Sequence, residues 1–288
     1  MITIFANPTA GSGLTKQNLF IVEEYLKNKN IEFVTLLSSY KGEITELVEN
    51  NAKEGDRLIV IGGDGTFNEF INGLSQPEKF DICFIPGGTG NDFSYALNNN
   101  DPIKILEKFL NNESKKVDYL SVNNFKCLNV CGVGLDADVL KRYEALPKKT
   151  KMGYAKCLVK VLCNFNFYKL KLKIDDEKEI EGEFMLIAAS NGKRFGANIY
   201  ISPNSVVDDG FIHLILIKKL KKFIIPFAFL GFIKGKHLKK SYAEEILCKK
   251  VEITNNEPSI TYNLDGQLFE GNKVVVEVKE KQINTYVE

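Results

Sequence analysis

The first third of the chain alternates short apolar runs with segments whose apolar residues recur at helical spacing. Strands buried on both faces read as continuous apolar runs, and the helices that join them cover the sheet. The pattern therefore predicts parallel βα units. The expected strands cover residues 2–6, 33–37, 57–61 and 82–85, and the expected helices cover 16–29, 44–54 and 67–74.

From about Asp118 onward, strand-like runs separated by turn residues follow one another, which favours a mainly antiparallel sandwich or barrel. Helical regions over 136–162 and 220–238 interrupt the series. We predict an α/β domain over 1–121 and a β-rich sandwich domain over 122–288, with its last residues free to return to the first domain. The expected strands here cover 125–130, 168–174, 180–190, 211–217, 250–254, 259–264 and 273–278.

A net charge of +1 over 288 residues gives no general argument for nucleic acid as a partner. Six cysteines lie in apolar stretches without a CxxC pair, so we expect free buried thiols in a reducing compartment. The N-terminus lacks the features of a signal peptide, and the uncharged run 223–233 is too short to span a bilayer. These features predict a cytoplasmic protein.

The third expected strand runs directly into a glycine-rich turn, Gly62-Gly63-Asp64-Gly65-Thr66, followed by a helix. Glycines let the backbone approach a ligand closely, and a helix N-terminus presents unpaired N–H groups to an anion. The turn therefore predicts a phosphate site. Because the carboxylate of Asp64 would repel phosphate, it is interpreted as an indirect Mg²⁺ ligand or a proton-handling group.

Two further turns follow the first and fourth expected strands. They read Asn7-Pro-Thr-Ala-Gly-Ser-Gly13 and Pro86-Gly-Gly-Thr-Gly-Asn-Asp92. Neither is a Walker A loop, because no Gly-Lys-Ser/Thr follows. In an open α/β sheet such turns gather at the carboxyl edge of the strands, where ligands bind. Two glycine turns that both carry Asp and Thr favour nucleotide binding over ordinary tight turns.

These motifs resemble those of the diacylglycerol kinase catalytic-domain family, which includes bacterial lipid kinases and is related to the sphingosine kinases. The resemblance continues through Gly132-Val-Gly-Leu-Asp-Ala137, Asn191-Gly192, residues 203–210 and Leu264-Asp265-Gly266. The GGDG turn is shared with NAD kinases and phosphofructokinases. The GTGND segment separates the lipid kinases from those relatives.

The resemblance implies an NAD kinase-like α/β nucleotide-binding domain followed by a β-sandwich lipid-substrate domain, with the site in the cleft. It implies ATP-dependent phosphorylation of a lipid hydroxyl, on diacylglycerol or a similar lipid at the membrane surface, with Mg²⁺ as cofactor. Whether the protein forms a homodimer is left undecided. The implied nucleotide contacts are Asn7, Ser38, Gly62, Gly63, Asp64, Gly65, Thr66, Phe67, Asn68, Gly88 and Thr89.

The same resemblance implies an acidic network of Asp64, Asp92 and Asp209, the first two with catalytic roles. A structural Mg²⁺ would be held by Asp209 with backbone carbonyls near Val206 and Phe211, and Asp265 would be the general base. From the residues alone, Asp209-Gly210 and Asp265-Gly266 also fit ordinary turns.

The chain departs from the family pattern at Gln267, where many members have Glu. If that Glu were the general base, the protein would have lost most of its kinase activity. If Asp265 is the base, Gln267 changes only a residue next to the base. Two alternatives therefore stay open: a soluble-substrate kinase resembling NAD kinase, and a nucleotide-binding module with little activity.

Lysines bracket the apolar run within 218–240, a composition suited to an anionic membrane surface or to a packed helix with solvated basic ends. His213 is expected in the core or at a strand edge. His237 is expected at the solvated surface.

Overall fold

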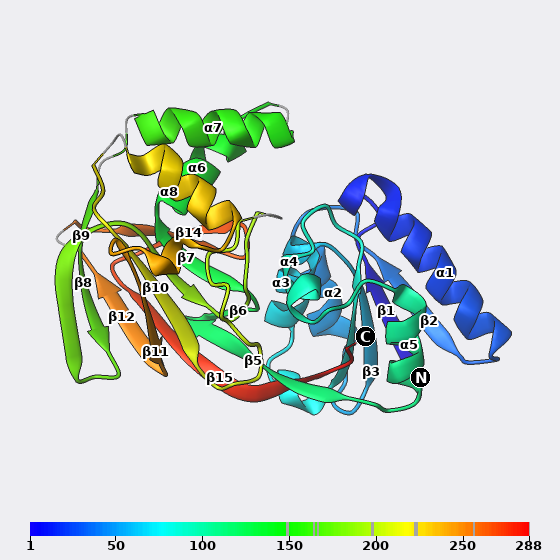
Figure 1. The fold of residues 1–288 in the computed structure, drawn as a ribbon. Coiled ribbons are helices and arrows are strands. Elements are labelled where there is room, and N and C mark those ends of the chain that lie inside the picture. Colours follow the sequence, from blue (N-terminus) through cyan, green and yellow to red (C-terminus); the bar gives the residue numbers. More distant parts are fainter. Residues whose placement is uncertain are drawn as a thin grey trace. The chain divides into compact units, whose positions relative to one another are not determined.

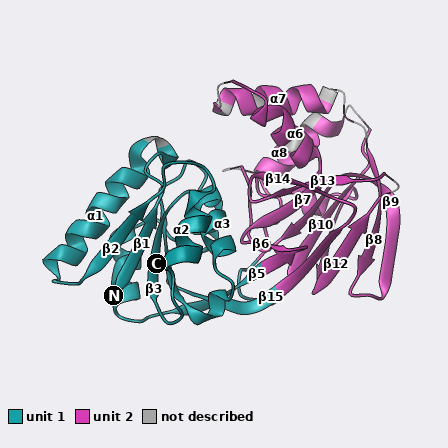
Figure 2. Ribbon diagram, turned by 180° about the vertical axis from the view of Figure 1, so that it is seen from behind, with its two compact units in different colours: residues 1–119, 206–210, 279–288 teal, residues 120–205, 211–278 magenta. Residues whose placement is uncertain are grey.

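The computed structural model describes residues 1–147, 150–163, 165, 167–196, 199–221, 224–255 and 257–287. The chain divides into two compact units, which Figure 2 colours separately. Unit 1 comprises residues 1–119, 206–210 and 279–288, and unit 2 comprises residues 120–205 and 211–278. Unit 1 thus takes in two segments from late in the sequence as well as the N-terminal region.

Unit 1 contains a parallel sheet in the order β2-β1-β3-β4, and the end of β15 pairs in parallel with β4 at Asn284 and Thr285. Helices α1 and α5 lie against one face and α2 and α3 against the other (Figure 1). The elements are β1 (Ile2–Ala6), α1 (Leu14–Asn28), β2 (Phe33–Leu37), α2 (Glu43–Asn51), β3 (Arg57–Gly62), α3 (Asp64–Gly73), β4 (Asp81–Pro86), α4 (Asp92–Ala96) and α5 (Pro102–Leu110). The predicted parallel βα units are confirmed.

The centre of unit 1 is apolar because the sheet is covered on both faces, as its continuous apolar strands predict. Phe67 and Phe70 of α3 pack edge to face on Phe84 of β4, with ring centroids 5.1 and 6.1 Å apart. On the other face, Tyr286 packs edge to face on Phe109 of α5. These contacts fix α3 on one face of the sheet and α5 on the other.

Unit 2 is mainly antiparallel, with the long strand β9 pairing with β7, β8 and β10. Its strands are β6 (Phe125–Cys127), β7 (Val130–Gly134), β8 (Tyr168–Ile174), β9 (Lys178–Ser190), β10 (Ile212–Lys218), β11 (Ala243–Cys248), β12 (Lys250–Thr254), β13 (Ile260–Leu264) and β14 (Gln267–Gly271). Strand β5 (Lys115–Val122) begins in unit 1 and ends in unit 2. Strand β15 (Val274–Thr285) begins in unit 2 and ends in unit 1. The predicted β-rich sandwich is confirmed.

Helices α6 (Leu135–Glu144), α7 (Lys151–Cys163) and α8 (Ile225–Ile233) gather on one side of the unit 2 strands (Figure 1). Their buried side chains share one apolar cluster with β9 and β10, which includes Val139, Leu158 and Ile215. A second cluster, which includes Leu172, Val251 and Tyr262, lies among the strands themselves. Unit 2 is therefore layered, with helices on one side and strands on the other.

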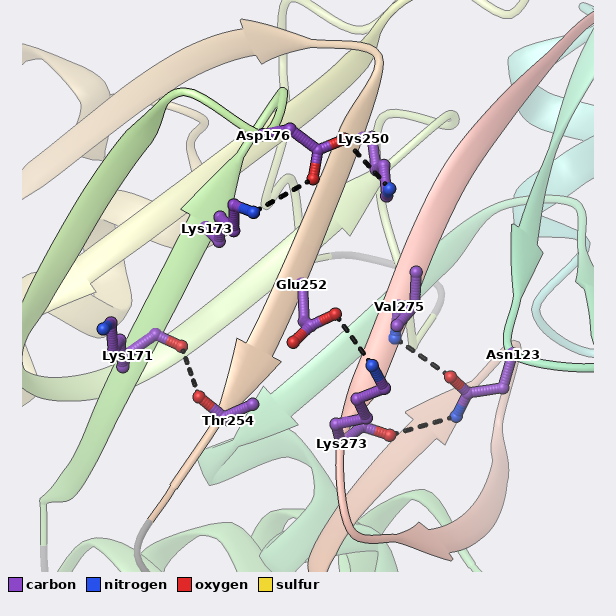
Figure 3. A network of polar contacts seen from close by, with 9 residues as sticks. All are labelled: Asn123, Lys171, Lys173, Asp176, Lys250, Glu252, Thr254, Lys273 and Val275. Carbon is purple, nitrogen blue, oxygen red and sulfur yellow. Dashed lines mark hydrogen bonds and ion pairs between the residues drawn. The ribbon is translucent and has the colours of Figure 1, made fainter.

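The other side of β8, β12 and β15 is polar. Asp176 is paired with Lys173 and Lys250, and Glu252 with Lys273, at 2.9–3.4 Å (Figure 3). The Asn123 amide donates to the Lys273 carbonyl just before β15 and accepts from the Val275 N–H of β15. Alternation of these exposed residues with buried ones is the period-2 signature of a half-buried sheet. Exposed pairs of this kind contribute about 0–1 kcal/mol each.

Several predicted boundaries were wrong. The single helical region over 136–162 is two helices with a turn between them, and the predicted strand over 125–130 is split between β6 and β7. The surface location of His237 was also wrong: its side chain is fully buried, Nε2 lies 2.9 Å from the Ile201 carbonyl oxygen, and desolvation lowers its pKa. The predicted location of His213 in the core or at a strand edge is confirmed: the residue is buried in β10, with Nδ1 2.8 Å from Glu245.

The five cysteines whose side chains the structure describes are free and buried, as predicted, while the side chain of Cys163 lies outside the described residues. Within the described part of the chain, no helix is both long and apolar enough to cross a membrane.

Candidate functional site

The two glycine turns after β3 and β4 pack against each other through their backbones. The Gly87 N–H donates to the Gly62 carbonyl at 2.6 Å. A Cβ placed on Gly88 would lie 2.4 Å from Gly63 Cα, and one on Gly63 would lie 2.9 Å from Gly88 Cα. The parallel register of β3 and β4, which pairs Gly62 with Pro86, creates this approach. Residues with side chains do not fit at Gly63 and Gly88, because the backbones of the two turns are in direct contact there.

The turn that begins at Asn7 joins the same cluster. Gly11 has φ +64°, and a Cβ there would overlap the Gly87 carbonyl oxygen at 1.7 Å. From α1, the Thr15 hydroxyl donates to the Gly87 carbonyl at 3.0 Å, and the Asn18 amide donates to the Pro86 carbonyl at 2.6 Å. All three predicted turns therefore meet at one edge of the sheet of unit 1.

Asp64 and Asp92 flank this cluster. Asp64 is the first residue of α3, and its Oδ1 accepts from the Phe93 N–H of α4 at 3.0 Å. A Cβ placed on Gly90 would lie 2.9 Å from Asp64 Oδ2 and 3.6 Å from Asp92 Oδ2, so both carboxylates face that glycine. The structure thus brings together two of the three acidic residues of the expected network.

The expected nucleotide contacts differ in accessibility. Asn7, Gly63, Asp64, Gly65, Gly88 and Thr89 reach the surface, whereas Ser38, Gly62, Thr66, Phe67 and Asn68 are buried. Phe67 is a core side chain, packed edge to face on Phe84. The accessible members can offer a ligand both side chains and backbone groups.

Two substitutions in the turn should have opposite effects on stability. Gly62→Ala would bring its Cβ to 2.5 Å from Cβ of Thr66 and should cost about 1–3 kcal/mol. Gly65 lies in α3, and a Cβ there would meet no atom within 4 Å beyond the neighbouring residues and the backbone of its own helix, so Gly65→Ala should stabilise by about 0.5–1 kcal/mol. Urea unfolding of both variants measures this. Equal stability of the two would contradict the close packing at Gly62.

The segment 206–210 is attached to unit 1 by Asp118, which is fully buried. The carboxylate of Asp118 accepts from the N–H groups of Gly210 and Lys281, each at 2.7 Å, and its own N–H donates to the Val207 carbonyl at 2.7 Å. Burial raises the pKa of Asp118, and the nearby carboxylates of Asp209 and Asp208 add to the rise.

The expected Mg²⁺ ligands lie around this attachment. Asp209 and Val206 are exposed in unit 1, whereas Phe211 is the first residue of the following part of unit 2, with Lys249 Nζ 4.2 Å from its ring centroid. Among the described residues, no group of three His, Cys, Asp or Glu side chains could hold a metal. A site here would depend on one carboxylate and backbone carbonyls, an all-oxygen donor set that suits Mg²⁺.

In unit 2, Asp265 and Gly266 form the two-residue turn between β13 and β14, with φ +49° and +89°. Positive φ at both positions is the signature of a type I′ hairpin turn. The carboxylate does more than shape the turn: Oδ1 accepts from the N–H groups of Asn129 and Val130 at 3.0 Å, and Oδ2 from that of Leu128 at 2.7 Å. The Cys127 thiol lies 3.3 Å from Oδ1. These contacts fix the orientation of the carboxylate.

Asp136 is a second carboxylate of unit 2, and the sequence-based reasoning assigned it no role. It lies in the first turn of α6, where its Oδ2 accepts from the Asn263 amide at 3.1 Å. Burial raises its pKa from 3.8 to about 7, against the lowering effect of Asn263 and of backbone N–H groups. A buried carboxyl with this shift makes stability depend on pH.

Asp136→Asn should remove that dependence. Because the pKa is higher in the folded state, the contribution of Asp136 to stability is complete below about pH 4 and is lost as the pH rises toward 7. The amide variant should therefore gain about 3 kcal/mol relative to the parent between pH 5 and pH 8. Urea midpoints at the two pH values measure this, and a constant difference would contradict the raised pKa.

The comparisons with known proteins agree with this geometry. Residues 1–122 match the model of the diacylglycerol kinase catalytic domain, and residues 129–286 match that of the YegS C-terminal NAD kinase beta sandwich-like domain. The pair of domains places the chain among the kinases built on the NAD kinase-like fold. Within this class, the chain belongs to the diacylglycerol kinase catalytic-domain family, which confirms the resemblance read from the motifs.

Individual relatives agree as well. The chain is 28% identical to the diacylglycerol kinase of Bacillus subtilis over 274 residues, covering 92% of this chain and 88% of the relative. A crystal structure of a diacylglycerol kinase from Bacillus anthracis has a TM-score of 0.73 at 20% identity and covers 100% of this chain and 96% of its own. An NAD kinase from Archaeoglobus fulgidus in complex with ATP has a TM-score of 0.56 at 15% identity, covering 99% and 93%. The last two comparisons show the fold.

Proposed function

We propose that the chain is an ATP-dependent lipid kinase that transfers the γ-phosphoryl group to a hydroxyl of diacylglycerol or a similar lipid. The observation that carries this proposal is the cluster of three backbone-packed glycine turns in unit 1, flanked by Asp64 and Asp92. Membership of a kinase family and the ATP complex of the NAD kinase with the same fold support it.

In this proposal, unit 1 holds the nucleotide. The accessible backbone of Gly63, Gly65 and Gly88 would lie against the phosphates, and the N-terminus of α3 would offer N–H groups to them. When bound, Mg²⁺ would offset the charge that spreads onto the transferred oxygens. Asp64 and Asp92 would orient the metal-bound nucleotide, while Asp209, with the carbonyls of Val206 and Phe211, would hold a separate structural ion.

Asp265 would supply the base in unit 2. The lipid hydroxyl oxygen forms a bond to the γ-phosphorus, the bond from that phosphorus to the β–γ bridging oxygen breaks, and ADP leaves. The hydroxyl proton passes to the Asp265 carboxylate, which the N–H groups of residues 128–130 hold in place.

ADP release from Mg-ATP, measured with a panel of mixed-micelle lipids and with NAD, tests the proposal. Turnover that depends on a lipid with a free hydroxyl supports it and names the acceptor. Turnover with NAD alone would overturn it in favour of a soluble-substrate kinase. ATP binding without turnover on any acceptor would instead favour a nucleotide-binding module.

We also propose that unit 2 docks on anionic membranes through α7 and α8. Phe227 and Leu230 of α8 are 73% and 54% exposed, and Met152 and Val159 of α7 are 69% and 59% exposed. Exposed lysines follow α8 at 234, 236, 239 and 240. Apolar side chains beside lysines are the composition of a surface that lies at an anionic lipid interface.

Phe227→Asp with Leu230→Asp should weaken sedimentation with phosphatidylglycerol vesicles at least tenfold, since burying each side chain contributes about 1.5–3 kcal/mol. Leu247→Asp is the matched control, because Leu247 is 52% exposed on β11 of the same unit. Equal vesicle binding by the double variant and the control would contradict docking through α8, as would binding that is insensitive to salt.

A further inference from the structure

A hydrogen-bonded chain leads from Asp136 on α6 to the turn that carries Asp265. Asn263 donates from Nδ2 to Asp136 Oδ2 at 3.1 Å, and its Oδ1 accepts from the Gly266 N–H at 2.9 Å. Gly266 is the second residue of the hairpin turn. All of these groups lie in unit 2. Asp136 thus reaches the Asp265 turn through a single side chain.

Asp136 and Asn263 are buried, and a neighbouring glycine leaves room for the Asp136 carboxylate. Asp136 and Asn263 are only 5% and 8% exposed, and a buried polar side chain costs free energy unless it is hydrogen-bonded. Asn263 pairs across the sheet with Gly132 of β7. A Cβ on Gly132 would lie 1.8 Å from Asp136 Oδ2, so the glycine leaves the space that the carboxylate occupies.

A ligand-binding role for Asp136 is less well supported by the space around it. Asp136 lines an apolar cavity with Tyr154, Leu158, Phe195 and Phe232, and the cavity measures about 20 Å³. That volume is roughly the room of one water molecule. The partner that the structure shows for the carboxylate is the Asn263 amide.

We propose that Asp136 and Asn263 form a brace that positions the Asp265 carboxylate, so that Asp136 is a positioning residue for phosphoryl transfer. The inference rests on the proposed role of Asp265 as proton acceptor. A small displacement of a reacting group slows a reaction strongly while leaving binding of the other substrate nearly unchanged. The brace should therefore act on kcat and not on the KM for ATP.

The test compares variants that keep or remove the acceptor. Asp136→Asn keeps an oxygen that can accept from Asn263, whereas Asp136→Leu removes it and Asn263→Ala removes both contacts. Asp138→Leu is the matched control, because Asp138 lies on the same helix and hydrogen-bonds Tyr168. We expect kcat to fall ten- to a hundredfold in Asp136→Leu and Asn263→Ala, with the KM for ATP within twofold. Asp136→Asn and Asp138→Leu should stay within threefold of the parent.

Hydrogen exchange of the Gly266 amide provides a readout that does not require lipid turnover. The brace predicts at least tenfold faster exchange in Asp136→Leu and little change in Asp138→Leu, even if the chain turned over no lipid and the proposed function failed. If Asp136→Leu does not fold, Asn263→Ala carries the test. Unchanged exchange and kcat in a folded brace variant, or equal losses in Asp138→Leu, would overturn the brace.

Discussion

Asp265→Ala is expected to lower kcat for lipid phosphorylation by about 10²–10⁴-fold, the usual contribution of a positioned base. The KM for ATP should change little, because the proposed nucleotide contacts lie in unit 1. The carboxylate is held by the N–H groups of residues 128–130, so its orientation is fixed before substrate binds. Steady-state kinetics with the acceptor identified by ADP release measure the effect.

A structural role for Asp265 must be separated from this one. Removing the carboxylate leaves buried N–H groups without their acceptor, at about 1–3 kcal/mol for an unsatisfied donor. Urea unfolding therefore accompanies the kinetics, and Cys127→Ala serves as a control that removes one donor while keeping the carboxylate. A folded Asp265→Ala protein that retains a tenth of the parental kcat would rule out Asp265 as the base.

Asp64→Ala is expected to lower kcat by about 10²-fold, because Asp64 is proposed to orient the metal-bound nucleotide and misplacing a reacting group by about 1 Å costs a factor of this size. Asp64 is placed by its hydrogen bond to the Phe93 N–H, and its second oxygen faces Gly90 together with Asp92. The loss of that hydrogen bond should also loosen the start of α4. Kinetics at saturating Mg²⁺ and ATP measure the effect on the chemical step.

Glu54→Ala is the control for Asp64→Ala. Glu54 is an acidic residue of the same unit, and its exposed pair with Lys79 at 2.9 Å contributes little to stability. It should leave kcat within twofold of the parent. If the two variants lost activity equally, general electrostatics rather than the position of Asp64 would explain the loss.

The parts of the fold that sequence predicts well are those set by local pattern. The apolar run of β3 and the glycines after it fix a strand and a turn through neighbouring residues alone. Edge elements such as β11 and β14 were not predicted, because their half-exposed residues show little alternation. His237 was misplaced because its neighbouring lysines indicate solvent, whereas its ring is enclosed by packing against Phe232 and the Ile201 backbone.

The residues of the candidate site likewise differ in how far they could be predicted from local sequence. The glycine turns and Asp64 carry a local signature, and Asp265 carries both a turn signature and a family motif. The roles of Asp118 and Asn263 were not predicted, because their hydrogen-bond partners are far away in the sequence. Asp118 accepts from the Lys281 N–H, 163 positions away, and Asn263 donates to Asp136, 127 positions away. In a single sequence such residues look like ordinary strand positions, and their hydrogen-bond partners become visible only in the folded structure.

Gln267 follows the Asp265 turn and pairs with Leu264 across the hairpin. The N–H and thiol donors to the Asp265 carboxylate described above come from residues 127–130. If Asp265 is the base, Gln267→Glu should therefore change kcat by less than tenfold. A gain of a hundredfold or more would instead indicate that a carboxylate at 267 is the missing base.

Transfer of ³²P from γ-labelled ATP into an extractable lipid tests the central claim most directly. The account predicts a labelled lipid product when a lipid with a free hydroxyl is present, at wild-type rates in Glu54→Ala and lost in both Asp64→Ala and Asp265→Ala. Label that appears only on NAD or as inorganic phosphate, or that reaches lipid undiminished in the two aspartate variants, would contradict it.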